Sequence, residues 1–541
     1  MNTINGQKFR QMLVAGANRL EVDKKMVDEM NVFPVPDGDT GTNMSLTVTS
    51  AVKEVMATTS DSVSDIAKAL SSGALRGARG NSGVIVSQLF RGLYKALKGS
   101  ESIDAVLFAE ALKKGVATAY KAVMKPKEGT ILTVARAAAE KAAELAVSED
   151  DLTVLMRDAL SYAEEILEQT PEMLPVLKEA GVVDAGGKGL TLIYHGFVEA
   201  LEREDDTVDP ILALSQTKQA AEEKAAKKAV YCVEISISSG SVTEAEEKSL
   251  TLLEDIRALG SSPLTGFSGD LLKLCIHTET PDKVLEKALT YGTLTTVKVE
   301  NMEISHEHVL GLQKAAKPQE ERKDIGFITI SVGEGLERIF TELGVDHVIS
   351  GGQTMNPSTE DILRGAEKVN ADHIIVLPNN KNIILAAKQA ALMSSEKQIH
   401  VLPTKSIPQG IAAMIGYMPG ESIDANLKQM NENLEAVTSG AVTYAVRDTH
   451  MGEFEIKEGN ILALKNGDMA HVGTDLMDTT RDLVDEMISD ETGIFTIYFG
   501  SESSRAQAEE LSAYVTENYP SVEVEIQEGD QPIYYFLLSA E

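Results

Sequence analysis

The chain has 541 residues, enough for several domains that each bury a core. Its 43% hydrophobic and 25% charged residues are typical of a soluble globular protein. Its formal net charge of −33 disfavours nucleic acid and anionic membrane surfaces as partners. We expect a cytoplasmic protein without a transmembrane segment, because the sequence has no long apolar stretch, no secretory signal and only two cysteines.

Residues 1–204 are predicted to form an all-α domain. Apolar residues recur at helical spacing near the start, as in Phe9, Leu13 and Leu20, and the alanine-rich stretch Thr133–Ala146 favours a helix. We expect the glycine-rich loops of this domain to gather at one end. Residues 205–228 are acidic and then rich in Ala, Lys and Glu, which predicts a helical or flexible linker.

Residues 229–314 are predicted to form a small α+β domain, because strand-like and helical patterns follow one another. The predicted elements are strand Tyr231–Ser238, helix Thr243–Leu259, strand Asp270–His277, helix Pro281–Tyr291 and strand Leu294–Glu300. A charged linker follows at Ala315–Asp324.

Residues 325–541 are predicted to form a two-lobed α/β domain. In its first lobe, strands and helices alternate as in a parallel sheet. The predicted strands are Ile325–Ser331, His347–Ser350, His373–Leu377 and His400–Pro403, and the helices are Gly335–Leu343, Thr359–Lys368 and Ile383–Ala391. Longer strand-like runs then indicate a lobe of mixed topology, at Thr443–Asp448, Gly459–Leu464, Gly493–Tyr498, Ser521–Gln527 and Ile533–Leu538.

The segment Asn31–Asn43 places two carboxylates, Asp37 and Asp39, just before a predicted helix. Pro34 and Pro36 fix their own φ angles and restrict the residues before them, so the loop is stiff. Paired carboxylates beside a helix N-terminus suit a divalent metal that carries phosphate, because oxygen ligands hold Mg2+ and the N–H groups face the anion. The alternative is an acidic turn that caps a helix, since Asp-Gly is ordinary turn chemistry.

Two further glycine-rich loops precede helical segments and favour a nucleotide site over a simple turn. They are Gly77-Ala-Arg-Gly-Asn-Ser-Gly83 and Val183-Asp-Ala-Gly-Gly-Lys-Gly189. Ser82 could cap the helix that follows or donate its hydroxyl to a phosphate. The sequence has no Walker A loop, no kinase glycine loop with its partner motifs and no complete dinucleotide fingerprint. We therefore predict a nucleoside triphosphate site outside the familiar nucleotide-binding folds.

On these motifs the N-terminal third resembles the nucleotide-binding subunit of dihydroxyacetone kinase, and the whole chain resembles the kinase component of bacterial fatty acid kinase. The matching motifs are NVFPVPDGDTGTNM (31–44), GARGNSG (77–83), GTILTV (129–134), VDAGGKG (183–189) and GGQTMNPSTEDI (351–362). In that family the N-terminal domain is a barrel of helices that binds ATP at one rim, with two Mg2+ between acidic side chains and phosphates.

The resemblance implies that Asp37 and Asp39 are catalytic Mg2+ ligands. A third aspartate of the family has its nearest equivalent in Asn31, a weaker neutral ligand. The glycine-rich loops are implied to contact ATP. The residues expected near the phosphates are Thr40, Thr42, Asn43, Met44, Gly80, Asn81 and Ser82, and those expected around the nucleoside are Gly129, Thr130, Asp184 and Gly186.

The resemblance further implies ATP-dependent phosphorylation of a fatty acid that is held by a separate carrier protein. The product would be an acyl phosphate for phospholipid synthesis, and the C-terminal domain would dock the carrier. One alternative is a small-ketone kinase of the dihydroxyacetone type, which the N-terminal domain alone would fit. Another is a nucleotide-sensing scaffold without catalysis, which the paired aspartates disfavour. Whether the chain forms a homodimer stays open.

The middle domain carries both cysteines, Cys232 and Cys275, on predicted strands, with His277 two residues beyond Cys275. Alternation places Cys275 and His277 on one face of their strand, and Cys232 on a neighbouring strand offers a third ligand, a set suited to Zn2+. The alternative is two small buried cysteines and a strand histidine without a metal. The resemblance supports the zinc hypothesis, because Cys232 matches a family cysteine and Cys275 a position usually held by histidine.

In the C-terminal domain, Gly351-Gly-Gln-Thr-Met-Asn-Pro357 is predicted to follow a strand, where open α/β sheets usually place their sites. Asn379, Asn380 and Lys381 follow the next strand and are expected to line the same crevice. The alternative for the first segment is a plain strand-to-helix loop with Ser358 or Thr359 as the helix cap.

Overall fold

The computed structural model describes most of the chain. The described residues are 1–31, 38–123, 125–205, 207–214, 231–238, 248, 251–253, 255–257, 259–268, 271–278, 280–301, 322–352, 356–446, 448–451 and 454–541. The chain divides into two compact units, residues 1–214 together with 321–541 and residues 215–320, and each unit is described by itself.

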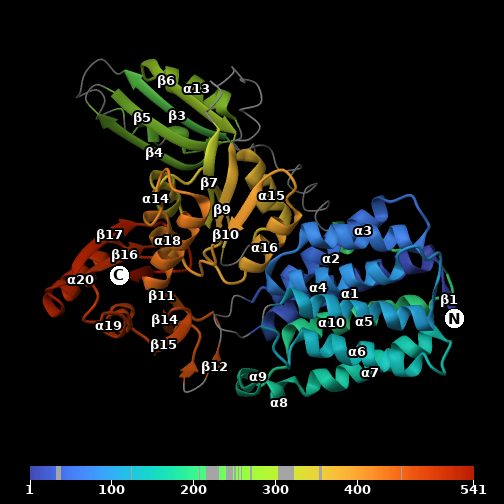
Figure 1. Ribbon diagram of the computed structural model, residues 1–541. Coiled ribbons are helices and arrows are strands. Elements are labelled where there is room, and N and C mark those ends of the chain that lie inside the picture. Colours follow the sequence, from blue (N-terminus) through green and yellow to red (C-terminus); the bar gives the residue numbers. More distant parts are fainter. Residues whose placement is uncertain are drawn as a thin grey trace. The chain divides into compact units, whose positions relative to one another are not determined.

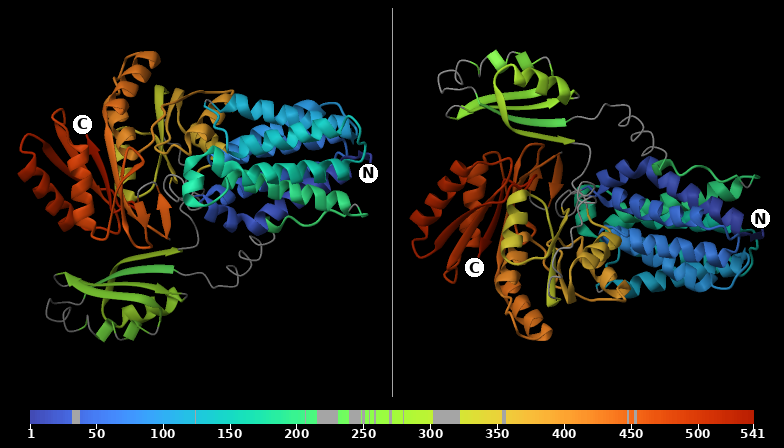
Figure 2. Two further views of the ribbon diagram at one scale, coloured as in Figure 1. Left: turned by 90° about the horizontal axis from the view of Figure 1, so that it is seen from below. Right: turned by 90° about the horizontal axis from the view of Figure 1, so that it is seen from above.

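The start of the chain forms the predicted helical domain, in which long helices lie side by side (Figure 1; Figure 2). The helices are α1 (Gly6–Met30), α2 (Thr40–Ala57), α3 (Val63–Gly77), α4 (Gly80–Leu97), α5 (Ala105–Ala122), α6 (Ile131–Leu145), α7 (Leu152–Glu168), α8 (Thr170–Met173), α9 (Pro175–Ala180) and α10 (Ala185–Glu202). A two-residue strand pair, β1 (Thr3–Ile4) with β2 (Ile103–Asp104), is the one addition to the predicted helices within these described residues. Apolar side chains from the helices fill a single core around Phe9, Phe108 and Phe197.

Glycines allow α1 to approach its neighbours closely. A Cβ added at Gly41 on α2 would lie 2.1 Å from the carbonyl oxygen of Lys24 on α1. A Cβ added at Gly196 on α10 would lie 2.5 Å from the backbone of Ala15 on α1. Larger residues at these two positions would push the helices apart, because protein interiors are close-packed. These close contacts hold α2 and α10 against α1.

Residues 215–320 contain an antiparallel sheet with the strand order β4-β5-β3-β6. Its described elements are β3 (Tyr231–Ser238), β4 (Ser261–Ser268), β5 (Leu271–Thr278), α13 (Pro281–Leu289) and β6 (Thr293–Asn301). The apolar side chains of β3 and β5 form the core with α13 through Val284 and Ala288. The strand β4 is not among the predicted elements, because Pro263 and Gly266 interrupt its pattern. Much of the predicted helix Thr243–Leu259 lies outside the described residues.

The first lobe of the C-terminal domain is a parallel sheet, as predicted, with the strand order β10-β9-β7-β8. Its strands are β7 (Lys323–Ser331), β8 (His347–Ser350), β9 (Ala371–Leu377) and β10 (Gln398–Val401). Its helices are α14 (Glu334–Glu342), α15 (Thr359–Lys368), α16 (Ile384–Met393), α17 (Ile407–Ile415) and α18 (Ile423–Ala436). From β7 the chain proceeds to β8 on one side and returns to β9 on the other, so the connections diverge at the carboxyl ends of β7 and β9.

The second lobe contains a sheet with the strand order β15-β14-β11-β18-β16-β17, in which only the β16–β17 pair is parallel. The elements are β11 (Thr438–Tyr444), β12 (Thr449–Met451), β13 (Phe454–Ile456), β14 (Ile461–Lys465), β15 (Asp468–Gly473), α19 (Leu476–Met487), β16 (Ile494–Phe499), α20 (Arg505–Asn518), β17 (Glu523–Glu528) and β18 (Phe536–Ala540). The prediction of mixed topology is confirmed. The prediction of a strand at Thr443–Asp448 has the wrong bounds, because β11 begins at Thr438 and ends at Tyr444.

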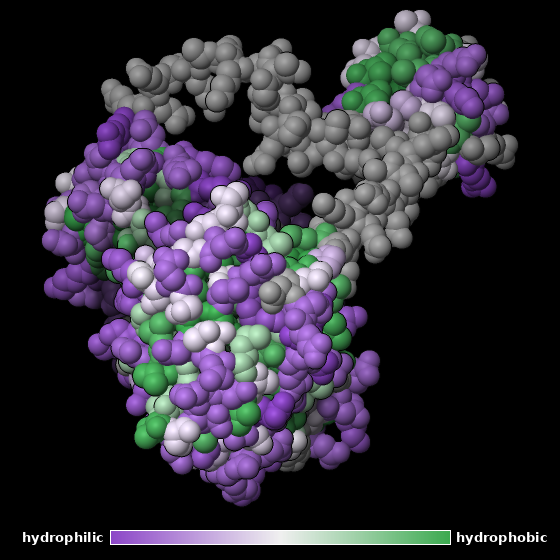
Figure 3. Space-filling view, turned by 90° about the vertical axis from the view of Figure 1, so that its right-hand side faces the viewer, coloured by the Kyte–Doolittle hydropathy of each residue, from purple (hydrophilic) through white to green (hydrophobic). Residues whose placement is uncertain are grey.

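One core joins the two sheets of the C-terminal domain. Phe327 and Leu377 from the parallel sheet, Met430 from α18 and Leu537 from the second sheet belong to the same apolar cluster. The surface that faces the viewer in Figure 3 is mostly hydrophilic, with apolar residues scattered among the polar ones. No helix among the described residues combines the length and the apolar character that would let it cross a membrane.

Candidate functional site

Asp39 lies at the N-terminus of α2, directly after the loop that contains Asp37. Only 7% of the surface of Asp39 is exposed. Its Oδ2 accepts a hydrogen bond of 2.5 Å from Nδ2 of Asn356, and the side chain of Asn43, one helical turn later, also bonds to it. The carboxylate is therefore held in one orientation. Asp37 lies outside the described residues, so its predicted role stays a prediction.

A second carboxylate, Asp28 in the last turn of α1, acts on Asp39 by its charge and was not among the predicted site residues. Its two oxygens accept hydrogen bonds from the backbone N–H of Thr42 at 2.9 Å and from the hydroxyl of Thr42 at 2.7 Å. Thr42, predicted to approach a phosphate, is thus bonded to an acid. Asn31, the predicted weak metal ligand, ends α1, and its N–H donates to the carbonyl of Asp28 at 3.1 Å. The position of Asp28 one turn before the motif was the signal that could have found it.

Burial raises the pKa of Asp39 to about 6, and the charge of Asp28 adds to the rise. Burial also raises the pKa of Asp28. Two neighbouring carboxylates that resist ionisation form a site that a cation would stabilise, because metal ligands bind in the deprotonated form. Their oxygen atoms suit a hard divalent cation such as Mg2+. Within the described part of the chain, no group of three or more His, Cys, Asp or Glu side chains is arranged to hold a metal.

The glycine-rich segment Gly77–Gly83 contacts Asn43, the last residue of the segment Asn31–Asn43. A Cβ added at Gly80, whose φ is +57°, would lie 2.6 Å from Nδ2 of Asn43, so only glycine fits at this contact. The helix α4 begins at Gly80 after the extended residue Arg79. Ser82 is therefore the third residue of α4, which excludes the first of its two suggested roles, the helix cap, and leaves the phosphate contact as a prediction. The first N–H groups of α4, at Gly80, Asn81 and Ser82, have no partner within the helix and can face an anion.

The residues predicted around the nucleoside gather at the N-termini of α6 and α10. Thr130 precedes α6, and Asp184 precedes α10 and accepts a hydrogen bond of 2.7 Å from the N–H of Gly187. A backbone hydrogen bond from Ile131, the first residue of α6, also reaches Asp184. A Cβ added at Gly186 would lie 3.2 Å from the Cβ of this isoleucine. Burial raises the pKa of Asp184 to about 6.

The other residues predicted to bind the nucleotide, Gly129, Thr40 and Met44, lie in or beside the same helices. Gly129 has a φ of +78°, and its N–H donates to Oγ1 of Thr133 at 2.9 Å. Thr40 is buried in the first turn of α2. Met44 is fully buried in the core, where a Cβ added at Gly189 on α10 would lie 2.7 Å from its sulfur, so α2 and α10 touch. The loops thus gather at one end of the domain, as the sequence pattern predicted.

The C-terminal domain supplies residues to the same site. Asn356, from the GGQTMNP block, is 2% exposed, and its Oδ1 has no hydrogen-bond partner among the described residues. Its carbonyl oxygen accepts a hydrogen bond of 2.7 Å from Nη1 of Arg79, and Nη2 of Arg79 lies 3.2 Å from Oδ2 of Asp361. Nδ2 of Asn81 donates to Oδ1 of Asn382 at 3.1 Å. An unsatisfied oxygen beside Asp39 is what a cation held there would use.

The alternative interpretation of the same block is also correct for its last residues. Ser358 caps α15, and Ser358 and Asp361 form a reciprocal capping box. The block therefore serves two purposes, since Asn356 turns toward Asp39 while Ser358 starts a helix. The contribution of Asn356 and Arg79 to this site was not predicted from the sequence.

The predicted zinc ligands lie in the other unit. The register of the sheet pairs Cys232 on β3 with His277 on β5, and Cys275 is two residues before His277. These backbone positions agree with the predicted grouping. The side chains of Cys232 and His277 are outside the described part, so zinc binding stays a prediction.

Replacing Asp39 with asparagine is expected to stabilise the metal-free protein at pH 7.5 by about 2 kcal/mol. The raised pKa means that the folded state holds a proton which the unfolded state releases nearer pH 3.8. The stability that Asp39 contributes is therefore complete below pH 3.8 and lost as the pH rises through about 6. Thermal unfolding in EDTA should show the advantage of Asp39→Asn shrinking as the pH falls from 7.5 to 4. An advantage that is independent of pH would contradict the burial of a titrating carboxylate.

Comparisons with known proteins cover nearly the whole chain. The DAK2 domain matches residues 34–199, the middle domain of FakA-like fatty acid kinase proteins matches residues 228–309, and the C-terminal domain of the same proteins matches residues 326–541. Protein YloV of Bacillus subtilis is 42% identical over 553 residues and is covered completely, as is this chain. Protein SAR1202 of Staphylococcus aureus, which is uncharacterized, is 42% identical over 550 residues with the same coverage.

Two solved structures show weaker similarity. The fatty acid kinase B3 protein of Streptococcus pneumoniae, loaded with linoleic acid, is 12% identical and covers 40% of this chain and 99% of its own, with a TM-score of 0.30. The dihydroxyacetone kinase of C. freundii, in complex with AMP-PNP and Mg2+, is 10% identical and covers 55% of this chain and 56% of its own, also with a TM-score of 0.30. At this TM-score the similarity does not establish a shared fold.

Proposed function

Because the chain belongs to the FakA-like family of fatty acid kinase proteins, we propose that it transfers a phosphoryl group from ATP to a fatty acid held by a separate carrier protein. The product would be an acyl phosphate for phospholipid synthesis. The observation that carries the proposal is the buried carboxylate of Asp39, which lies where two glycine-rich helix entrances meet.

The acceptor requires little chemistry from the protein. A fatty carboxylate has a pKa near that of glutamate, about 4.3, and is already ionised at neutral pH, so no general base is needed. The site has to hold the phosphates, align the acceptor with them and neutralise charge. The N-terminus of α4 offers backbone N–H groups for this purpose, and α2 and α4 both contribute the positive ends of their helix dipoles.

Asp37 and Asp39 would hold Mg2+, with Oδ1 of Asn356 as a neighbouring oxygen donor. Bound Mg2+ would supply the positive charge that stabilises phosphoryl transfer. The protein keeps Asp39 oriented through Asn43 and Asn356. Since Asp39 has a raised pKa, metal binding at neutral pH should be stronger than at pH 5, where the carboxylate holds a proton.

The proposal is tested by incubating the chain with ATP, Mg2+ and a carrier loaded with fatty acid, and by trapping any acyl phosphate with hydroxylamine. We expect hydroxamate that depends on all three components. Dihydroxyacetone in place of the loaded carrier serves as the competing acceptor. Phosphorylation of dihydroxyacetone without hydroxamate would identify a small-ketone kinase. ATP binding without transfer to either acceptor would favour a nucleotide-sensing scaffold.

A further inference from the structure

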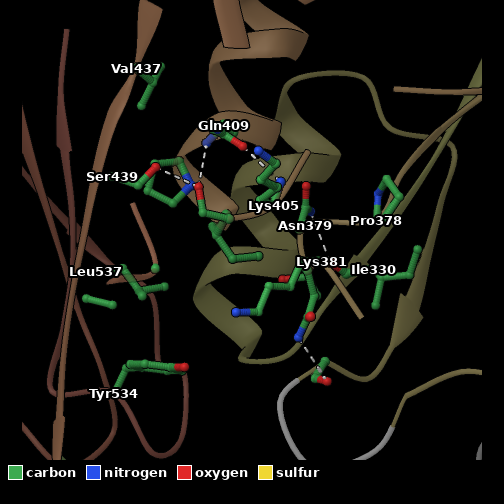
Figure 4. Close-up of a pocket in the computed structure, with 18 of the residues that line it drawn as sticks. Ile330, Pro378, Asn379, Lys381, Lys405, Gln409, Val437, Ser439, Tyr534 and Leu537 are labelled. Atoms are coloured by element: carbon green, nitrogen blue, oxygen red, sulfur yellow. Dashed lines mark hydrogen bonds between the residues drawn. The ribbon is translucent and has the colours of Figure 1, made fainter. Parts of the chain in front are cut away.

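A cavity of about 520 Å³ lies in the C-terminal domain at the carboxyl ends of β7 and β9. Figure 4 shows Ser439 and Leu537 on one side of it. The hydroxyl of Ser439 contacts the hydroxyl of Ser406 at 2.7 Å, so these polar groups of the wall bond to each other and do not favour one class of ligand. The prediction of a shared crevice is confirmed, because the lining includes Gly351, Gly352, Asn379, Asn380 and Lys381.

A surface of the helical domain has a clearer chemical character. The helices α4 and α5 lie side by side (Figure 1; Figure 2), and a Cβ added at Gly92 on α4 would lie 2.3 Å from the carbonyl oxygen of Lys114 on α5. Residues 80–127, which include both helices, contain eight Lys and Arg residues but only three Asp and Glu residues, although the whole chain has a net charge of −33. The basic surface is defined by Arg91, Lys95, Lys98, Lys113, Lys114, Lys121, Lys125 and Lys127.

The cations of the basic surface are open to water and lack acidic partners. The seven lysines are exposed, and Arg91 is half-buried. Among the residues that the structure describes, none of the eight forms an ion pair, whereas Arg136 of the same domain pairs with Glu128. The helix α4 contains no acidic residue, and α5 contains only Glu110.

The cations of the two helices also repel one another. Burial lowers the pKa of Lys95, and the charges of Arg91, Lys114 and Lys121 lower it further. Repulsion between like charges is unfavourable and is relieved when an anion binds. Stabilisation of the helix dipoles explains only Lys95 and Lys121, which lie in the last turns of α4 and α5. The other cations indicate an anionic partner.

The residue types favour a lipid surface over a protein or a nucleic acid. Seven of the eight cations are lysines, and lysine is depleted at protein–protein interfaces, where arginine and aromatic residues are enriched. Val106 on α5 is 61% exposed, and helical spacing places it on the same face as Lys113. An exposed aliphatic side chain can enter the apolar boundary of a bilayer. The ring of Tyr120 has Cζ of Arg136 over its face at 5.9 Å, so this face is not offered to a nucleic acid base.

We propose that the basic surface binds a membrane surface that contains anionic phospholipids. The lysines lie beside the lipid phosphates, and Val106 enters the headgroup boundary. Clusters of roughly four to eight Lys and Arg residues commonly bind anionic leaflets. The net charge of −33 made such a partner unexpected for the chain as a whole, but charges more than about 8 Å apart are largely screened at physiological ionic strength. The local surface therefore decides the contact.

The proposal goes beyond phosphoryl transfer, and its test does not depend on the kinase assay. The full chain is sedimented with vesicles in the absence of ATP, Mg2+ and carrier. Vesicles of phosphatidylcholine with about 30% phosphatidylglycerol are compared with vesicles of phosphatidylcholine alone. We expect binding to the anionic vesicles to be at least about tenfold tighter at ~0.05 M NaCl and to be lost at ~0.5 M. Equal binding to both kinds of vesicle, or no binding to the anionic ones at low salt, would overturn the proposal.

Two double variants locate the contact on the protein. Lys95→Glu combined with Lys114→Glu should weaken binding to the anionic vesicles at least about tenfold, because it reverses two neighbouring charges of the basic surface. The control combines Lys68→Glu with Lys428→Glu, two exposed lysines outside this surface, and changes the net charge equally. The control should bind as the unmodified chain does, and thermal unfolding shows whether both variants keep the fold. Equal weakening by the two double variants would refute the assignment to the basic surface.

A nucleic acid is the competing occupant of the basic surface. Double-stranded DNA is added to the vesicle-bound chain at the same phosphate concentration as the anionic lipid. We expect the chain to stay on the vesicles, because the exposed aliphatic side chain of Val106 gains contacts only with lipid. Release of the chain into the DNA-bound form would assign the surface to nucleic acid and refute the lipid proposal.

Discussion

Asp39→Asn is expected to lower ATP-dependent acyl phosphate formation by ~10³-fold. The substitution preserves the shape of the side chain and one acceptor oxygen for Asn43 or Asn356, but it removes the charge that would hold Mg2+. The loss should appear in kcat, because charge stabilisation matters most in the transition state. Steady-state hydroxamate formation measures it, and thermal unfolding shows whether the fold is retained.

The control for this experiment is Asp158→Asn on α7, an exposed aspartate in the same domain. It changes the net charge by the same amount and should retain full activity. Activity of Asp39→Asn within a few-fold of the unmodified chain would show that Asp39 is not a ligand of the catalytic metal. Loss of activity in both variants would instead indicate an effect of net charge.

Asn356→Leu is expected to reduce phosphoryl transfer by about 10- to 100-fold and to raise the Mg2+ concentration needed for half-maximal activity. Leucine has a similar size but cannot donate to Oδ2 of Asp39 or offer an oxygen to a cation. Groups that orient a metal ligand commonly have effects of this size. The measurement is a Mg2+ titration of hydroxamate formation at saturating ATP and loaded carrier.

The matched control is Asn426→Leu, the same substitution at another buried amide. Asn426 bonds to the backbone of Met418 at 2.7 and 3.1 Å and holds the start of α18, with no contact to Asp39. It should lower the unfolding temperature and leave the Mg2+ dependence unchanged. If Asn356→Leu behaves in the same way, the contact between Asn356 and Asp39 is only structural.

Local sequence patterns predicted most of the helices and strands, because the spacing of apolar residues within each one depends on residues that are close together in the chain. Helical spacing of apolar residues marked the N-terminal domain, and strand–helix alternation marked the parallel sheet of β7 to β10. The failures also have local causes. Pro263 and Gly266 interrupt the strand pattern of β4. Of the two roles that the sequence left open for Ser82, the helix cap is excluded because α4 already begins at Gly80.

The sequence by itself determined the family motifs, the helical character of the first domain and the place of Asp39 at a helix N-terminus, since each depends on residues close together in the chain. Only the tertiary structure decided that Asn356, 317 residues away, bonds to Asp39, and that Ser331, Asn379 and Gln531 surround one cavity. Contacts between such distant segments arise when packed helices and sheets bring loop ends together. These long-range contacts leave no periodic pattern in the sequence, because the burial and the hydrogen-bond partners of each residue depend on the segments that pack against it in the folded chain.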